Sequence, residues 1–188
     1  MTERATTLVP MVVEQSRRTR VTVHVSRFEM DLNRPREGAI YLEPDDAWGI
    51  EVWQTLPPRK TYEASLATYD LFYAQIGELL TALIARHGRI VVLDLHSYCH
   101  RRGGPHARPA PLSSNPEVNV GTGNLDRDRW GAVVDRFIHD LRGYRLRPGR
   151  LDVRENVRFR GGHMSKWIGE EFGRSACVLA VEVKKIFM

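Results

Sequence analysis

The segment at residues 91–98, VVLDLHSY, places three polar side chains at the end of an apolar run: Asp94, His96 and Ser97. Ligands of open α/β sheets bind at the carboxyl ends of the strands. Imidazole is a good zinc ligand, and a metal-bound histidine needs a hydrogen-bond acceptor such as Asp94 to fix its tautomer. We therefore predict His96 as a metal ligand. The alternative is a histidine that only caps a strand with a hydrogen bond.

A second segment, at residues 176–185, is apolar except for Glu182 until it reaches Lys184 and Lys185. Carboxylates are rarely fully buried unless they are paired. A glutamate in this setting either pairs with a cation or faces a cavity, where it can transfer protons as a general base. We predict Glu182 as that base. The alternative is an edge-strand glutamate that faces water or pairs with one of the two lysines.

Two further segments have the residue types of a substrate pocket. In SRFEMDLNRP, residues 26–35, Arg34 can present a planar fork to a carboxylate, and Asn33 can add a hydrogen bond. In ENVRFRGGH, residues 155–163, a Gly-Gly pair precedes a predicted helix and allows close approach of the backbone to a ligand. The alternative for the first segment is a loop with solvated surface ion pairs.

The remaining histidines and Cys99 carry weaker metal-binding signals. No H-E-x-x-H, Walker, G-x-G-x-x-G or G-x-S-x-G motif occurs in the chain. We expect these side chains to be mainly structural, and His163 fits a capping role beside the Gly-Gly turn. The possible additional ligands are His24, Cys99, His100, His106 and His163.

The elements that would position these residues follow from hydrophobic periodicity and from start and stop signals. Strands alternating with helices predict an α/β domain with a largely parallel or mixed sheet. Asp126 is a plausible N-cap. The expected strands are 20–26, 89–95 (buried on both faces), 117–120 and 175–183, and the expected helices are 62–86, 126–142 and 163–172.

Length and composition are those of an ordinary globular protein. The 188 residues suit a single domain over 1–188, and the chain is 42% hydrophobic and 27% charged. No apolar run reaches the ~18 residues of a membrane span, and no signal peptide is evident, so we expect a cytoplasmic protein with reduced cysteines and no membrane partner. The net charge of +5 is spread along the chain, which suits a small anionic substrate better than a nucleic acid.

In combination, the ordered segments resemble the N-formylglutamate amidohydrolase family. The matching segments are SRFEMDLNRP (26–35), VVLDLHSY (91–98), NVGTG (119–123), ENVRFRGGHMSKW (155–167) and AVEVKK (180–185). The resemblance implies a three-layer α/β/α fold, related to the zinc carboxypeptidase and aspartoacylase class, with one catalytic Zn²⁺. It implies hydrolysis of N-formyl-L-glutamate to formate and L-glutamate, a deformylation step in histidine degradation.

The same resemblance assigns roles residue by residue. It implies that His96 binds zinc and that Glu182 is the catalytic glutamate. It implies that Asn33 and Arg34 receive a substrate carboxylate. With less support, it places Asn156 and Gly162 in the substrate pocket.

The resemblance also predicts an incomplete metal site. Enzymes of this class take a histidine and an acidic ligand from a segment upstream of the match to residues 26–35, and no such motif precedes Ser26. We therefore expect an N-terminally truncated fold. The alternatives are a related metallo-deacylase or carboxypeptidase that acts on another acyl amino acid, a metal-free relative that binds an acidic metabolite, and an Arg-rich nucleic-acid binder. The sequence does not determine the oligomeric state.

Overall fold

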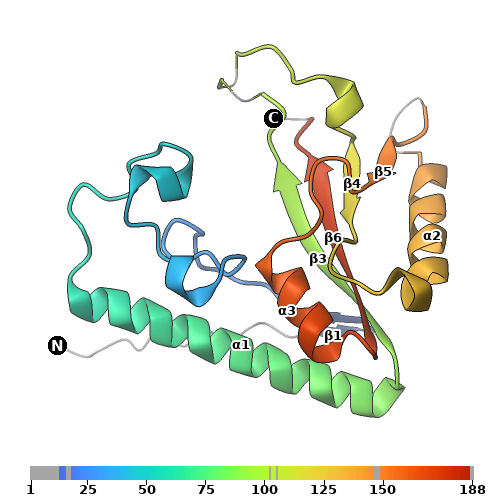
Figure 1. Ribbon diagram of the computed structural model, residues 1–188, viewed down its shortest axis with the longest axis horizontal. Coiled ribbons are helices and arrows are strands. Elements are labelled where there is room, and N and C mark those ends of the chain that lie inside the picture. Colours follow the sequence, from blue (N-terminus) through green and yellow to red (C-terminus); the bar gives the residue numbers. More distant parts are fainter. Residues whose placement is uncertain (1–12, 16–17, 102, 105, 146–148, 187–188) are drawn as a thin grey trace. The chain divides into compact units, whose positions relative to one another are not determined.

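The computed structural model describes residues 13–15, 18–101, 103–104, 106–145 and 149–186. The chain divides into two compact units, Met1–Leu79 and Leu80–Met188. The first unit is rich in loops, and the second contains the main sheet (Figure 1). The expectation of a single domain over the whole chain stays a prediction.

The first unit packs its loops against the beginning of helix α1, Arg59–His87. The phenol groups of Tyr69 and Tyr73 donate hydrogen bonds to the carbonyls of Arg34 (2.8 Å) and Leu32 (2.6 Å). Because both donors lie on one face of the helix, they fix the loop that carries Arg34. Two short strands, β1 (Val13–Gln15) and β2 (Arg18–Arg20), and two 3-10 turns, Arg36–Gly38 and Pro44–Ala47, complete the described elements.

Helix α1 ends where the sequence predicts. Gly88 follows it with a φ of 75° and donates its N–H to the carbonyl of Ile84 at 2.7 Å. This left-handed residue satisfies a carbonyl that the helix leaves unpaired. Strand β3 then begins at Ile90, so the turn aims the chain directly into the sheet.

The second unit is built on a four-stranded mixed sheet in the order β3-β6-β4-β5. Strand β3 (Ile90–Tyr98) pairs in parallel with β6 (Ala176–Lys184), and β4 (Val118–Gly121) pairs in parallel with β5 (Val153–Glu155). The β4–β6 pair is antiparallel. The sheet is therefore mixed with mostly parallel pairs, which confirms the predicted fold class.

Helix α2, Arg127–Gly143, covers one face of this sheet. Asp126 caps it, because its side chain accepts the N–H groups of Asp128 (3.0 Å) and Arg129 (3.1 Å). This confirms the predicted N-cap. The core beneath α2 is formed by alternating strand residues and helix residues: Val118, Val120, Val153, Cys177, Leu179, Val181, Trp130, Val134 and Ile138.

Helix α3, His163–Phe172, packs on β6 and forms the third layer. Figure 1 shows it well separated from α2. The Gly161–Gly162 turn before it lies against β4. A Cβ on Gly121 would stand 2.8 Å from the backbone nitrogen of Gly161, and Gly161 itself has a φ of 120°. The absence of a side chain at Gly121 thus lets two protein segments approach each other closely, and the expected approach of the Gly-Gly backbone to a ligand stays a prediction.

Two details of the predicted elements are wrong. Residues 21–26 are not a strand, although they alternate in hydrophobicity, because the described pairing joins Arg18–Arg20 to Val13–Gln15. Strand β3 is not buried on both faces. Among the described strands it pairs with β6 alone, and Val91, Leu93 and Leu95 are 50%, 45% and 68% exposed.

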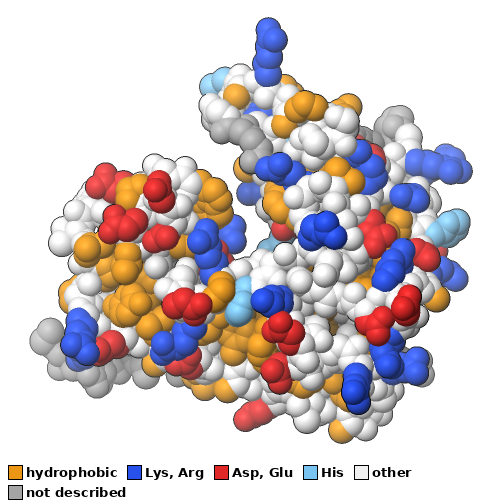
Figure 2. Space-filling view, viewed as in Figure 1, with side chains coloured by type: hydrophobic (Ala, Val, Ile, Leu, Met, Phe, Trp, Pro, Cys, Tyr) orange, Lys and Arg blue, Asp and Glu red, His pale blue; other side chains and the backbone are white. Residues whose placement is uncertain are grey.

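No helix in the described part of the chain has the length and apolar character needed to cross a membrane. On the face shown in Figure 2, Lys and Arg side chains of both units are interspersed with Asp and Glu rather than gathered into one stripe.

Candidate active site

His96 and Glu182 occupy neighbouring positions on the parallel strands β3 and β6. They are paired in the register of these strands, and Glu182 is paired in turn with Asn119 on β4. Paired residues of adjacent strands point to the same face of a sheet, and adjacent strands lie about 4.8 Å apart. The sheet therefore brings an imidazole, a carboxylate and an amide into one row. We call His96, Glu182 and Asn119 the central row.

Asp94 lies two residues before His96 and shares its face of the strand. Its Oδ1 is 2.8 Å from Nε2 of His96, and the two side chains are 14% and 26% exposed. Oδ2 of Asp94 is buried and has no hydrogen-bond partner in the described structure. An imidazole that donates from Nε2 to a carboxylate carries its lone pair on Nδ1, so this pair orients the ring and sets its tautomer.

Asn119 is fully buried and holds the loop beside the central row. Its Oδ1 accepts the N–H groups of Arg158 (2.8 Å) and Phe159 (3.3 Å), and its Nδ2 donates to the carbonyl of Phe159 (2.8 Å). The ring of Phe159 meets Tyr98 edge-on at 5.3 Å between centroids. These contacts fix the loop at residues 158–159 over the carboxyl end of β3.

Lys184 lies two residues beyond Glu182 on the same face of β6 and is 5% exposed. Its Nζ donates to the carbonyl of Asn115 at 2.9 Å. Its backbone N–H donates to the carbonyl of Glu117 at 2.8 Å. The strand that carries Glu182 is therefore fixed at its end by a buried cation.

The predicted pocket residue Asn156 is engaged within the second unit. It has a φ of 53°, its Oδ1 accepts the N–H of Thr122 (2.9 Å), and its Nδ2 donates to Oγ1 of Thr122 (2.8 Å). Gly162 is the N-cap residue of α3, and its carbonyl accepts the hydroxyl of Ser165 at 3.0 Å. Both residues therefore have structural roles, and their contact with a substrate stays a prediction.

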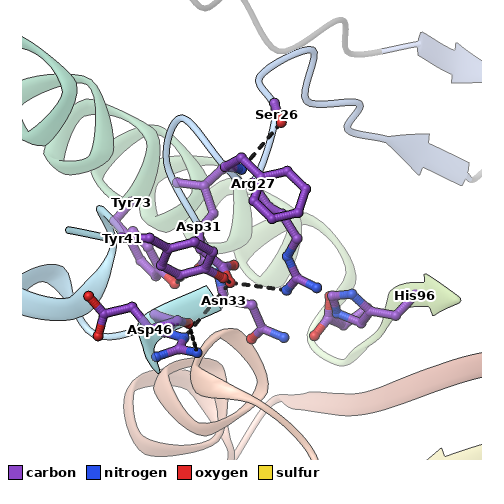
Figure 3. Close-up of polar contacts among 12 residues, drawn as sticks. Ser26, Arg27, Asp31, Asn33, Tyr41, Asp46, Tyr73 and His96 are labelled. Atoms are coloured by element: carbon purple, nitrogen blue, oxygen red, sulfur yellow. Dashed lines mark hydrogen bonds and ion pairs between the residues drawn. The ribbon is translucent and has the colours of Figure 1, made fainter. Parts of the chain in front are cut away.

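The predicted substrate-binding pair, Asn33 and Arg34, belongs to the first unit. Asn33 lies beside the buried carboxylate of Asp31 (Figure 3). Asp31 is 3% exposed. Its Oδ1 accepts the backbone N–H of Asn33 at 2.9 Å, and its Oδ2 accepts Nη2 of Arg27 at 3.0 Å and the phenol of Tyr41. Asp31 thus joins Arg27, Asn33 and Tyr41 in an ordered cluster around a buried carboxylate.

Arg34 is held from several sides. Its Nη2 donates to the carbonyl of Asp46 at 2.8 Å, and its Nε is 4.0 Å from Oδ2 of Asp31. Its guanidinium carbon lies 5.0 Å from the ring centroid of Tyr41 and 5.9 Å from that of Trp48. The side chain is 34% exposed. A cation that is fixed in this way and partly exposed is suited to bind an anionic group.

This cluster shifts the pKa of two of its members. Burial and the hydrogen bond to Asp31 raise the pKa of Tyr41 to about 12. Backbone N–H groups of Glu43 and Leu42 donate to Asp46 and lower the pKa of that carboxyl, and the charge of Arg34 lowers it further. Both phenol and carboxyl therefore keep their ordinary protonation states across the neutral range.

The described residues do not complete a zinc site. A catalytic zinc takes three protein ligands and keeps an open position. No group of three or more His, Cys, Asp or Glu side chains converges within the described ranges. Beside the central row, the Asp94–His96 pair offers atoms that can bind a metal ion. Oδ2 of Asp94, which has no hydrogen-bond partner in the described structure, is one of them.

Sequence reasoning missed three residues that organise these sites. Asp31 looked like part of a solvated charge run, yet it is buried. Asn119 lies in an apolar strand-like run, and a polar residue there is the signal that identifies it. Trp48 gives no signal in the sequence, because its contacts with Arg27 and Arg34 depend on the fold of the loop.

A family model described as N-formylglutamate amidohydrolase matches residues 4–188. No curated protein matches the chain at a significant level.

Two solved structures share its fold. A gene product from Agrobacterium tumefaciens has 19% sequence identity and a TM-score of 0.55, over 88% of this chain and 59% of that one. An N-formylglutamate amidohydrolase from Ralstonia eutropha has 16% identity and a TM-score of 0.55, over 85% of this chain and 61% of that one. The chain thus spans less than two thirds of the length of these structures.

Proposed function

Because the chain belongs to the N-formylglutamate amidohydrolase family, we propose that it acts in the hydrolysis of the formamide bond of N-formyl-L-glutamate, which yields formate and L-glutamate. The observation that carries the proposal is the central row, in which Glu182 stands between His96 and Asn119 on adjacent strands. In the cell, this reaction would serve the breakdown of histidine.

Glu182 is the general base in this proposal. Its carboxylate takes a proton from the attacking water and delivers it to the nitrogen of the leaving amine as the C–N bond breaks. Lys184 fixes the end of the strand that carries Glu182, and this contact helps to fix the backbone from which the carboxylate projects. Positioning a base in this way lowers the entropic part of the barrier.

Arg34 and Asn33 bind a carboxylate of the substrate in this proposal. The support is the fixed, partly exposed guanidinium of Arg34, held by Asp46 and Asp31. Asn156 and Gly162, in the second unit, are further substrate-binding residues of the proposal. A dicarboxylic substrate fits the arginine-rich, net positive chain, since positive potential steers anions.

One zinc ion belongs to the proposal as a cofactor, and it would supply a Lewis acid for the formyl carbonyl. His96 would be one ligand, with its ring oriented by Asp94. A catalytic zinc takes three protein ligands, so further ligands are required beyond this pair. A relationship to the zinc carboxypeptidase class and a cytoplasmic location also stay predictions.

The test is formate release from a panel of substrates by the purified chain, with and without added Zn²⁺. We expect N-formyl-L-glutamate to be hydrolysed faster than N-formyl-L-glutamine and N-acetyl-L-glutamate. Faster release of acetate than of formate would instead favour a related deacylase. Preference for a peptide with a free carboxyl terminus would favour a carboxypeptidase.

A second candidate is a metal-free relative that binds an acidic metabolite without turnover. It is favoured by the lack of a three-ligand group in the described ranges. Isothermal titration separates the two functions. Saturable binding of N-formyl-L-glutamate, with no formate released at any zinc concentration, would support the binding protein.

A further inference from the structure

Trp48 has a backbone conformation that bulky side chains rarely adopt. It follows the 3-10 turn Pro44–Ala47 with a φ of 59° and a ψ of 33°, in the left-handed region. In this region the Cβ of an L-residue crowds its own backbone, so glycine is the usual occupant. The next residue is a glycine, Gly49, with a φ of 84°. A second glycine at position 48 would form the same turn without strain.

Burial of apolar surface does not explain a tryptophan at this position, since Trp48 is 63% exposed. Its contacts are with cations and with one aromatic ring. The guanidinium carbon of Arg27 lies 5.3 Å from its ring centroid, and that of Arg34 lies 5.9 Å away. Tyr41 meets it edge-on at 5.9 Å between centroids. Tryptophan is the strongest of the aromatic rings in attracting cations.

The two arginines also share one anion. Nη2 of Arg27 is 3.0 Å from Oδ2 of Asp31, and Nε of Arg34 is 4.0 Å from the same oxygen. Asp31 thus lies against both guanidinium groups, and the carboxylate of Asp46 also interacts electrostatically with Arg34. The ring of Trp48 attracts both cations without supplying a hydrogen-bond acceptor, and it therefore fixes them while leaving their remaining N–H donors available to an anion.

We propose that Trp48 is a positioning residue that holds the guanidinium groups of Arg27 and Arg34 in the orientation in which the cluster binds a carboxylate. The left-handed backbone of Trp48 has an energetic cost, and this task of the ring is the function that we assign to it. The inference rests on the proposed function for its physiological ligand. The positioning itself is a property of the free protein and can be measured without substrate.

The first measurement is NMR of the arginine Nε–H groups, assigned with Arg27→Lys and Arg34→Lys variants. A guanidinium above an indole ring experiences a ring-current shift. In Trp48→Gly, both signals should move towards the values of a free arginine, and the heteronuclear NOE of the Arg34 signal should fall. Trp48→Phe should retain part of both effects, because a smaller ring still attracts cations. Unchanged shifts and NOE values in Trp48→Gly would overturn the inference.

Thermal unfolding separates positioning from a purely structural role. Trp48→Gly removes left-handed strain and an exposed ring, so its midpoint should equal or exceed that of the unmodified chain. A large fall in the midpoint would assign Trp48 to the packing of the loop instead. The control is Leu56→Gly, which removes another exposed side chain of the first unit (57% exposed) and should alter neither arginine signal.

Binding of N-formyl-L-glutamate then links the positioning to function. In Trp48→Gly the dissociation constant should rise roughly threefold to tenfold, the range expected for loss of a cation–π contact. An unchanged dissociation constant would overturn the link between Trp48 and the ligand. If the unmodified chain does not bind N-formyl-L-glutamate, the proposed function fails, while the NMR experiment still decides the positioning role.

Discussion

Glu182 on β6 is paired with His96 on β3 in the parallel register, and with Asn119 on β4 in the antiparallel register. This relationship places a carboxylate between an imidazole and a buried amide. The two strands that flank β6 thus present their polar residues to the same face.

Replacing Asp94 tests the orientation of His96. In the intact chain the two side chains are 2.8 Å apart. We expect Asp94→Asn to weaken zinc binding by roughly tenfold to a hundredfold, the usual effect of losing the acceptor behind a metal-bound histidine. Competition titration with a chromogenic chelator gives the affinity. The control is His139→Ala, which removes an exposed histidine from α2 of the same unit.

If zinc binding in that titration is equal for the unmodified chain, Asp94→Asn and His96→Ala, then His96 is not a metal ligand. In that case its role would be limited to the hydrogen bond with Asp94.

Arg34→Ala removes the cation predicted to bind the substrate carboxylate. A hydrogen bond to a charged group contributes about 1.5–3 kcal/mol, so kcat/KM for N-formyl-L-glutamate should fall roughly tenfold or more. The value for an uncharged N-alkylformamide should change little. Arg59→Ala is the matched control, because Arg59 is 90% exposed and pairs with Glu63. Equal losses on both substrates would make Arg34 a structural residue.

Asn119→Ala should destabilise the second unit. The substitution leaves the N–H groups of Arg158 and Phe159 and the carbonyl of Phe159 without the partner that the fully buried side chain of Asn119 supplies in three partly buried bonds. Each unsatisfied buried group costs about 1–3 kcal/mol. We expect the free energy of unfolding in urea to fall by about 3 kcal/mol. Gln54→Ala removes an exposed amide and should cost little. A loss near zero would mean that water replaces Asn119.

The raised pKa of Tyr41 predicts a decline of stability at high pH. Its folded value is about 12, against an ordinary value of 10.0, so the folded state retains a proton that the unfolded state has lost. This contribution is complete below pH 10 and is lost as the pH rises through about 12. Tyr41→Phe should therefore flatten the decline between pH 10 and 12.

The measurement is urea unfolding at pH 9 and at pH 11.5. Tyr144→Phe, which removes a phenol that is 60% exposed, controls for the substitution itself. A decline that is as steep in Tyr41→Phe as in the unmodified chain would contradict the role of the Tyr41–Asp31 contact.

Local patterns in the sequence predict most of the elements. The helices expected at 62–86, 126–142 and 163–172 are found at Arg59–His87, Arg127–Gly143 and His163–Phe172. Their boundaries depend on local signals, such as Asp126 and Gly88, that can be recognised without the fold. Strand β5, Val153–Glu155, was missed because three residues are too short to show a period.

Pairing between distant segments is less accessible to sequence reasoning. The alternation at residues 21–26 is typical of a strand, but a strand also needs a partner that a local pattern cannot supply. The apolar run of β3 predicted a buried strand, whereas its place at the edge of the described sheet leaves Leu95 exposed. His96 and Glu182 are each indicated by a separate segment of the sequence. They lie side by side only because β3 pairs in parallel with β6, and no local pattern predicts that pairing.

The role of Glu182 is tested most directly by formate release from N-formyl-L-glutamate, measured for the unmodified chain and for Glu182→Gln under the same zinc concentration. We predict that the unmodified chain releases formate. We predict that Glu182→Gln lowers kcat by roughly a hundredfold to ten-thousandfold, the range for loss of a general base, with unchanged zinc content and thermal midpoint. Glu171→Gln, an exposed glutamate of α3, should retain full activity. Full activity in Glu182→Gln would contradict the account.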